Sequence, residues 1–306
     1  MLRPVTKALI LLLAKMLCTA TQTAQSAHHV VALPCAMATP RAARDEVRAE
    51  YINVAGLPTW HEVGGDGPTV VLLHGAFAGA SSWAAQAPVL RQAGFRVHVP
   101  ERRGHAHTPD VNGPLSYLAM TQDTVAYLEE VIVGSADLVG WSDGAVVAVL
   151  VALRRPELVR RLVLIGQYYN SSGKVPDSPL LAFLRSPQAG AYLRQEYDSV
   201  SPDGPRHFPV VFAKTLAMIE REPELDLEQF RAIKAPTLVL QGDQDEVTLG
   251  HSVEVVSKLA EGRLAVLPGS HALPLECPDV VNSLLLFFLR STREQAGEDE
   301  LNASPT

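Results

Sequence analysis

The sequence predicts an α/β fold in which a mainly parallel central sheet is flanked by helices, and three observations lead to this prediction. Short apolar runs alternate with helical patterns through most of the chain, as in β-α-β units. The 306 residues are enough to bury a full core. The range 167–233 breaks the alternation and so predicts a helical insertion after the sixth strand.

Each element follows from its local pattern. The range 49–62 suggests an opening hairpin, and the later strands are expected at 70–73, 97–100, 138–140, 162–165, 238–240 and 264–267. Helices are expected at 81–92, 117–131, 143–153, 252–259 and 279–289. The helix at 143–153 is apolar nearly all round, so it should be buried in the centre. Within the insertion, prolines separate short pieces, of which 180–184 and 208–220 look helical.

The pentapeptide Gly140-Trp141-Ser142-Asp143-Gly144 lies between two apolar runs and reads as a strand, a sharp turn and a helix. Larger side chains two residues either side of Ser142 would collide with the neighbouring strand and helix. The N–H groups and the dipole at the helix start can stabilise an oxyanion. A turn with a helix-capping serine is the competing interpretation of this string.

Two further residues complete a possible catalytic set. A serine nucleophile needs a base, and the base needs an orienting acid. The apolar run 236–241 leads into Gly242-Asp243-Gln244-Asp245, and the run 263–267 leads into a loop that ends at His271. Reactive groups of open α/β sheets lie just after strands, so Asp245 is the favoured acid and His271 the favoured base.

The order of these motifs resembles that of the α/β-hydrolase superfamily over the range 51–289. The Trp-Ser-Asp elbow is similar to the elbow of small capped serine hydrolases such as valacyclovir hydrolase-like esterases. The resemblance implies an acid three residues after Gly242, which favours Asp245 over Asp243 and Glu246. It also implies an oxyanion hole formed by the N–H of Asp143 and an N–H of the loop after the third strand. Ala76 is the expected donor there, and Phe77 is the second candidate.

The resemblance implies roles for several other side chains. His74 would support the oxyanion loop through hydrogen bonds, and the turn with His105 and His107 would shape the loop beside the pocket rather than bind zinc. The insertion would form a cap over the elbow, with Trp141, Tyr168 and Phe212 as substrate-binding residues. The aromatic residues of the insertion equally suit the cap's own core; they are Tyr168, Tyr169, Phe183, Phe208 and Phe212.

Asp143 has two interpretations. Its carboxylate suits the first turn of the following helix, where acidic side chains are favoured. Alternatively, the carboxylate faces the pocket and attracts a cationic group of the substrate. The sequence leaves both open.

Composition limits the partners. The net charge of -7 and the lack of basic runs argue against nucleic acid. The sequence contains no phosphate-binding loop, dinucleotide fingerprint or metal-binding string, so neither a cofactor nor a metal is expected. The expected partner is a small-molecule acyl substrate, and the oligomeric state is open.

The two ends of the chain look different from the predicted hydrolase domain at 48–291. Residues 1–44 contain no acidic residue and include the apolar stretch 8–14, which is too short to span a bilayer. The extension 1–47 reads as a signal or transit peptide, or as an upstream segment if translation begins at Met37. We expect a cytoplasmic enzyme, or a secreted or organellar one if residues 1–36 act as a targeting peptide. The acidic tail 292–306 is expected to be disordered.

Together these observations predict a serine hydrolase that cleaves an ester, a lactone or a related acyl bond through Ser142, His271 and Asp245. A carbon–carbon bond hydrolase or a cofactor-free perhydrolase or haloperoxidase could use the same three residues. A ligand-binding receptor on a hydrolase scaffold is the alternative from another functional class. Ser142 argues against epoxide and haloalkane chemistry, for which relatives in the superfamily use aspartate at the elbow.

Overall fold

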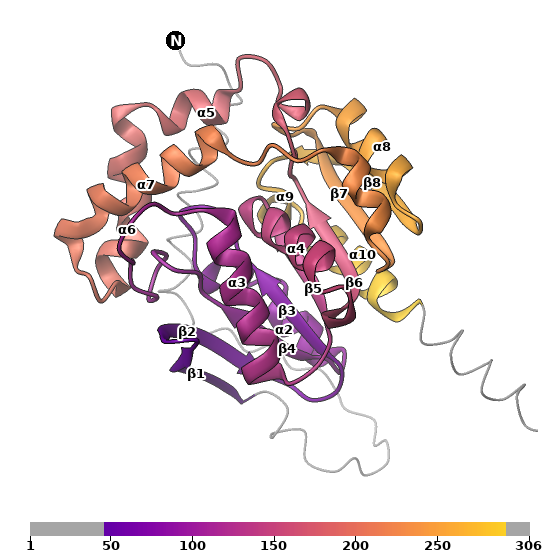
Figure 1. Ribbon diagram of the computed structural model, residues 1–306, viewed down its shortest axis with the longest axis horizontal. Helices are drawn as coiled ribbons and strands as arrows, with labels where there is room; N and C mark the ends of the chain where they lie inside the picture. The colour runs from indigo at the N-terminus through magenta and orange to yellow at the C-terminus, as the bar shows by residue number, and fades with distance from the viewer. Residues whose placement is uncertain (1–45, 292–306) are drawn as a thin grey trace, which may run out of the picture.

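An eight-stranded sheet forms the centre of the computed structural model, which describes residues 46–291 (Figure 1). The strands are β1 (Val47–Val54), β2 (Leu57–Gly64), β3 (Thr69–Leu73), β4 (Arg96–Pro100), β5 (Ala136–Trp141), β6 (Val159–Ile165), β7 (Thr237–Gln244) and β8 (Gly262–Ser270). They lie in the order β1-β2-β4-β3-β5-β6-β7-β8; β2 pairs antiparallel with both β1 and β4, and all other neighbouring strands are parallel. The prediction of a mainly parallel sheet flanked by helices is confirmed. The expectations for residues 1–45 and for the tail 292–306 lie outside the described residues.

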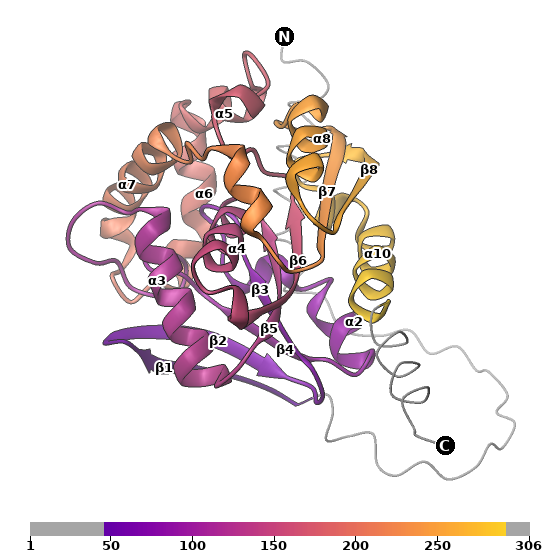
Figure 2. The same cartoon turned by 45° about the vertical axis from the view of Figure 1, so that its right-hand side comes forward.

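Helices cover both faces of the sheet (Figure 2). On β3, Val71 and Leu73 pack with α3 (Tyr117–Tyr127), α4 (Asp143–Arg154) and α8 (Leu249–Lys258). The alternating residues Val70 and Leu72 pack on the other face with α2 (Ala87–Gln92) and α10 (Pro278–Arg290). Because successive side chains of a strand point to opposite faces, a strand that is apolar throughout requires this double cover.

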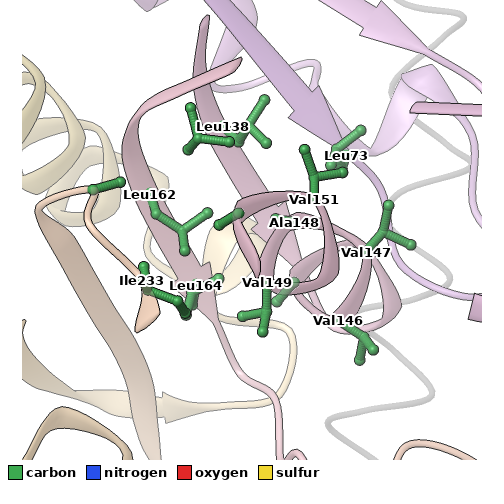
Figure 3. Close-up of a cluster of buried hydrophobic side chains, with 14 of the residues drawn as sticks. Leu73, Leu138, Val146, Val147, Ala148, Val149, Val151, Leu162, Leu164 and Ile233 are labelled. Atoms are coloured by element: carbon green, nitrogen blue, oxygen red, sulfur yellow. The ribbon is translucent and has the colours of Figure 1, made fainter. Parts of the chain in front are cut away.

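Helix α4 lies at the centre of the first cluster, as Figure 3 shows. Its residues from Asp143 to Val149 are all buried, so the prediction that this helix is buried in the centre is confirmed. Side chains of β3, β5 and β6 contact it from the sheet, including Leu73, Leu138 and Leu164. The start of α4 is therefore held rigidly against the ends of three strands.

Two helices differ from their predicted bounds. The range 81–92 is divided into the 3-10 helix η3 (Ala80–Trp83) and α2, and Pro88 lies in the first turn of α2. The range 117–131 holds α3 and then a π-helical turn, η4 (Leu128–Ile132). Both differences arise where local backbone hydrogen bonding changes although the apolar pattern continues.

Three helices lie between β6 and β7, and we call them the cap helices: α5 (Pro179–Leu184), α6 (Pro187–Val200) and α7 (Phe208–Arg221). They lie together, apart from the helices that cover the sheet (Figure 1). Helix α6 differs from the prediction, which has no helix there because prolines commonly interrupt helices. In all three cap helices a proline occupies the first turn, where its missing N–H costs no hydrogen bond.

The remaining elements are short. They are the 3-10 turns η5 (Pro156–Leu158), η6 (Ser171–Gly173), η7 (Pro205–His207) and η8 (Leu227–Ala232) and the helix α9 (Leu273–Glu276). Within residues 46–291, no helix has the length and apolar character needed to cross a membrane.

Candidate active site

Ser142 occupies a strained turn between β5 and α4. Its backbone angles are φ 54° and ψ −125°, a region that costs non-glycine residues about 1–3 kcal/mol. A Cβ atom on Gly144 would lie 2.0 Å from the carbonyl oxygen of Leu73, and one on Gly140 would lie 2.4 Å from the carbonyl oxygen of Gly144. The two glycines therefore allow the strand, the turn and the helix to pack closely around the serine.

Ser142, His271 and Asp245 follow directly after the parallel strands β5, β8 and β7 and form one hydrogen-bonded chain. Ser142 Oγ lies 3.0 Å from His271 Nε2, and His271 Nδ1 lies 2.9 Å from Asp245 Oδ1. The carboxylate assigns the ring proton to Nδ1, which leaves Nε2 free to accept the serine proton. This is the arrangement that nucleophilic catalysis by serine requires.

The Asp245 carboxylate also governs the charge of the histidine. Burial lowers the pKa of His271, but the charge and hydrogen bond of Asp245 outweigh it, so the pKa is raised overall. The two rival acids do not contact the ring. Asp243 accepts a hydrogen bond from the N–H of Gly269, and Glu246 accepts from Ser178 and Leu180.

The loop after β3 passes directly beside the serine. A Cβ atom on Gly75 would lie 3.3 Å from Ser142 Cβ, and Ala76 and Phe77 line the same cavity as Ser142 and Asp143. As the first residue of α4, Asp143 has a backbone N–H without an acceptor inside its own helix. The loop and the helix start thus provide backbone donors close to the serine.

Two buried side chains hold this loop through one carbonyl group. The Gly75 carbonyl oxygen accepts from His74 Nδ1 at 2.8 Å and from Arg102 Nη2 at 2.8 Å, while His74 Nε2 accepts from the Arg102 backbone N–H at 3.1 Å. In a trans peptide the C=O and the following N–H point in opposite directions. The N–H of Ala76 therefore points away from His74 and Arg102. Burial and the nearby Arg102 charge lower the pKa of His74 well below its usual value, which keeps the ring neutral.

Glu101 ties the same loop to the loop after β4. Its buried carboxylate accepts from the N–H of Ala80 at 2.9 Å and from the N–H of His107 at 2.7 Å. The hydrogen bond to Glu101 raises the pKa of His107, whereas burial lowers the pKa of His105 to about 3. Within the part of the chain that the structure describes, no cluster of residues could hold a metal ion.

The Asp143 side chain is buried and accepts a hydrogen bond from the Tyr117 hydroxyl at 2.7 Å. Its other oxygen, Oδ2, is buried and has no hydrogen-bond partner among the described residues, so the carboxylate does not cap its own helix. Burial raises its pKa, while the charge of Arg102 and the hydrogen bond of Tyr117 act in the opposite direction. This geometry favours a structural role for the Asp143 carboxylate.

A cavity of about 700 Å³ opens at Ser142 between the strand ends and the cap helices. Trp141 and Tyr168 line it, and Trp141 Nε1 donates to the His271 carbonyl oxygen at 2.9 Å. Phe212, the third expected substrate-binding residue, is not among the residues that line this cavity. It packs on Phe77 and Phe208, with ring centroids 5.2 and 5.6 Å away.

The remaining aromatic residues of the insertion also fall into two groups, one that lines the cavity and one that packs on other aromatic rings. Phe183 lines the cavity, whereas Tyr169 is fully buried between Phe230 and His251, and Phe208 packs against Tyr197. Sequence reasoning missed several further residues of the cavity wall: Gln167, Lys174, Leu181, Leu184, Glu196 and Ile219. Only Gln167 carried a signal, since it follows the end of β6.

Comparison with known proteins places this geometry in context. The sequence model described as "Alpha/beta hydrolase family" matches residues 70–284. Pyrrolizixenacetamide deacetylase of Xenorhabdus hominickii is 28% identical over 249 residues, which cover 75% of this chain and 93% of that protein. Epoxide hydrolase 3 of Siraitia grosvenorii is 31% identical over 142 residues, which cover 46% of this chain and 43% of that protein.

Among solved structures, 2-hydroxy-6-oxo-6-phenylhexa-2,4-dienoate hydrolase from Rhodococcus sp. strain RHA1 is similar in fold. Its TM-score is 0.66 at 22% sequence identity, and the match covers 80% of this chain and 99% of that one.

Proposed function

The chain belongs to the α/β-hydrolase family, and from this premise we propose that it is a serine hydrolase that cleaves an ester, a lactone or a related acyl bond of a small molecule. The observation that carries the proposal is the hydrogen-bonded chain Ser142–His271–Asp245, which opens into a cavity of about 700 Å³. The match to a deacetylase over most of both chains agrees with acyl transfer to water.

In the proposed first half-reaction, His271 Nε2 takes the proton of Ser142 as its oxygen attacks the carbonyl carbon of the substrate. The C=O electron pair moves to the oxygen, and the resulting oxyanion accepts from the N–H groups of Ala76 and Asp143. The bond to the leaving group then breaks as His271 returns the proton to it. An acyl-enzyme on Ser142 remains.

In the second half-reaction, His271 takes a proton from water, and the hydroxide oxygen attacks the acyl carbon. Collapse of the second oxyanion breaks the bond to Ser142, which regains its proton from His271, and the acid product leaves. Throughout, Asp245 would hold the proton of His271 on Nδ1 and stabilise the charged imidazolium. No step needs a cofactor.

A carbon–carbon bond hydrolase is the second candidate, because it could use the same three residues; the dienoate hydrolase from Rhodococcus sp. strain RHA1 shares the fold. At 22% identity this likeness supports the fold alone, so only substrates can separate the two functions. The partial match to an epoxide hydrolase carries less weight, because Ser142 stands at the elbow of this chain and the match spans less than half of either protein.

The test is intact-protein mass spectrometry after incubation of the full chain with a fluorophosphonate probe. We expect a single adduct that is absent from the Ser142→Ala variant. A matched control is Ser81→Ala, which removes another cavity-lining hydroxyl and should keep the adduct. An unlabelled, folded wild-type protein would overturn the proposal. Labelled enzyme would next be assayed with p-nitrophenyl esters, p-nitroanilides and a vinylogous diketone, which separate acyl from carbon–carbon cleavage.

A further inference from the structure

The charged groups that line the cavity differ in their hydrogen-bond and ion-pair partners. Three of them are carboxylates with hydrogen-bond donors close by: Asp143 accepts from a tyrosine hydroxyl, Glu196 from a serine hydroxyl at 2.5 Å, and Glu246 from a serine hydroxyl and a backbone N–H. Lys174 is the cation among these lining residues.

The Lys174 ammonium group has no acidic partner in the part of the chain that the structure describes. Its Nζ lies 5.0 Å from the centre of the Tyr168 ring, the distance of a cation–π contact. Among the described lysines, Lys214 pairs with Asp110 and Lys258 with Glu228, whereas Lys234 is exposed and lies outside the cavity. An aromatic face attracts the charge but leaves the three N–H donors of the ammonium group free.

The backbone around Lys174 is fixed relative to the proposed catalytic residues. The carbonyl oxygen of Gly173 accepts from the N–H of Thr248 at 2.9 Å, and the N–H of Val175 donates to the carbonyl oxygen of Glu246 at 3.0 Å. These bonds pair the lysine segment with the residues that directly follow Asp245. The backbone of Lys174 therefore belongs to the fixed frame of the site, so that a ligand needs to order only the side chain.

A ligand that covers Lys174 removes water from its ammonium group. An apolar ligand group would leave the donors unpaired, which is unfavourable, whereas a carboxylate would form charge-assisted hydrogen bonds with them. The nearby cap wall is hydrocarbon, with Leu181 and Leu184 facing the same cavity. The cavity thus combines an apolar part of the cap wall with one lysine on a fixed backbone, while the three carboxylates of the wall already accept hydrogen bonds from neighbouring groups.

We propose that Lys174 and Tyr168 form an anion subsite, and that the substrate carries a carboxylate separated by an apolar portion from the bond that is cleaved. This inference rests on the proposed acyl hydrolase function and adds a substrate class to it.

The kinetic test compares pairs of esters that differ only in one carboxylate. On the acyl side, the mono-p-nitrophenyl ester of adipate is compared with p-nitrophenyl hexanoate. On the alcohol side, 4-carboxyphenyl butyrate is compared with phenyl butyrate. For each pair, the anionic-to-neutral ratio of kcat/KM is measured for wild type, Lys174→Met and Lys174→Glu. The matched control is Lys234→Met, which removes an exposed lysine outside the cavity.

We expect Lys174→Met to lower the ratio about 10- to 100-fold for at least one pair, as loss of a hydrogen bond to a charged group implies. Lys174→Glu should lower it further, and Lys234→Met should leave it within about twofold of wild type. The pair that responds identifies which part of the substrate carries the carboxylate. If, for both ester pairs, Lys174→Met changes the anionic-to-neutral ratio of kcat/KM no more than Lys234→Met does, the subsite proposal is wrong.

A binding measurement separates this failure from failure of the proposed function. In a Ser142→Ala background, calorimetry compares monoethyl adipate with ethyl hexanoate, with and without Lys174→Met. Tighter binding of the adipate ester that depends on Lys174 supports the subsite, even if the wild-type chain cleaves no ester. Equal binding by both proteins refutes the subsite, even if Ser142 reacts with the fluorophosphonate.

Discussion

Replacing Asp245 by Asn tests whether this carboxylate is the acid of the proposed catalytic chain. Asp245 Oδ1 accepts both from His271 Nδ1 at 2.9 Å and from the N–H of Glu246 at 2.7 Å. An asparagine with its carbonyl oxygen in that position keeps both hydrogen bonds. Its NH₂ group then occupies the place of Oδ2, which is buried and has no partner among the described residues. The substitution therefore removes the charge while largely keeping the orientation of the ring.

The magnitude follows from the lost attraction between the carboxylate and the imidazolium that forms in the transition state. Two unit charges about 4 Å apart attract by about 4 kcal/mol at an effective dielectric constant of about 20. At about 1.36 kcal/mol per factor of ten, kcat/KM should fall about 10³-fold. If the amide instead turns its NH₂ group toward His271, the ring proton moves to Nε2, and the loss should approach the roughly 10⁴-fold known for the wrong tautomer.

The pH profile of kcat/KM gives a second, independent readout. His271 must be neutral to accept the serine proton, so activity rises with pH through the pKa of His271 in the free enzyme. Asp245 raises that pKa, so the acid limb of the wild-type profile should lie above the usual histidine value. In Asp245→Asn the acid limb should move to lower pH. The assay is steady-state hydrolysis of a p-nitrophenyl ester across the neutral pH range.

The matched control is Asp243→Asn, which neutralises a nearby exposed carboxylate that bonds to the N–H of Gly269. It should change kcat/KM by no more than a few fold. A loss below about tenfold in Asp245→Asn, an unmoved acid limb, or an equal loss in Asp243→Asn would refute the assignment of the acid.

Three further predictions follow from the surroundings of the site. Arg102→Met removes a donor to the Gly75 carbonyl and should lower kcat about 10- to 100-fold with little change in KM, as measured by steady-state kinetics. A thermal melt of the same variant reports whether it is folded. If the loss of kcat is explained by partial unfolding of the variant, the positioning role of Arg102 is refuted. Tyr117→Phe leaves the Asp143 carboxylate buried without its hydroxyl donor and should lower the free energy of unfolding by about 1–3 kcal/mol in urea titrations, and unchanged stability would contradict it. Phe212→Leu should lower stability without altering the preference for acyl-chain length, because this ring lies outside the cavity wall.

The sheet and the order of the candidate residues could be predicted because the signals are local. Ser142, Asp245 and His271 each follow an apolar run, and parallel strands bring their carboxyl ends to one edge. The five-residue motif around Ser142 is likewise a local signal, although the atom that excludes a Cβ at Gly144 is the carbonyl oxygen of Leu73 on β3.

The insertion and two of its helices could be predicted, but helix α6 and the side-chain directions could not, because they depend on packing between distant segments. Phe212 and Phe183 are both aromatic residues of the insertion, yet only Phe183 reaches the cavity. The carboxylate of Asp143 turns toward Tyr117, a residue of another helix. Lys174 reaches the cavity because its segment pairs with the residues after Asp245, a contact that no local pattern encodes.

The position of the cap helices has a consequence for protein engineering. They occupy one continuous insertion between β6 and β7, whereas Ser142, Asp245 and His271 follow strands of the sheet. A mutant library confined to residues 179–221 would therefore vary the cap wall without touching the hydrogen-bonded chain. Such a library could be selected for new substrates while every member keeps the same reactive residues, so chemistry and recognition could evolve separately in this protein.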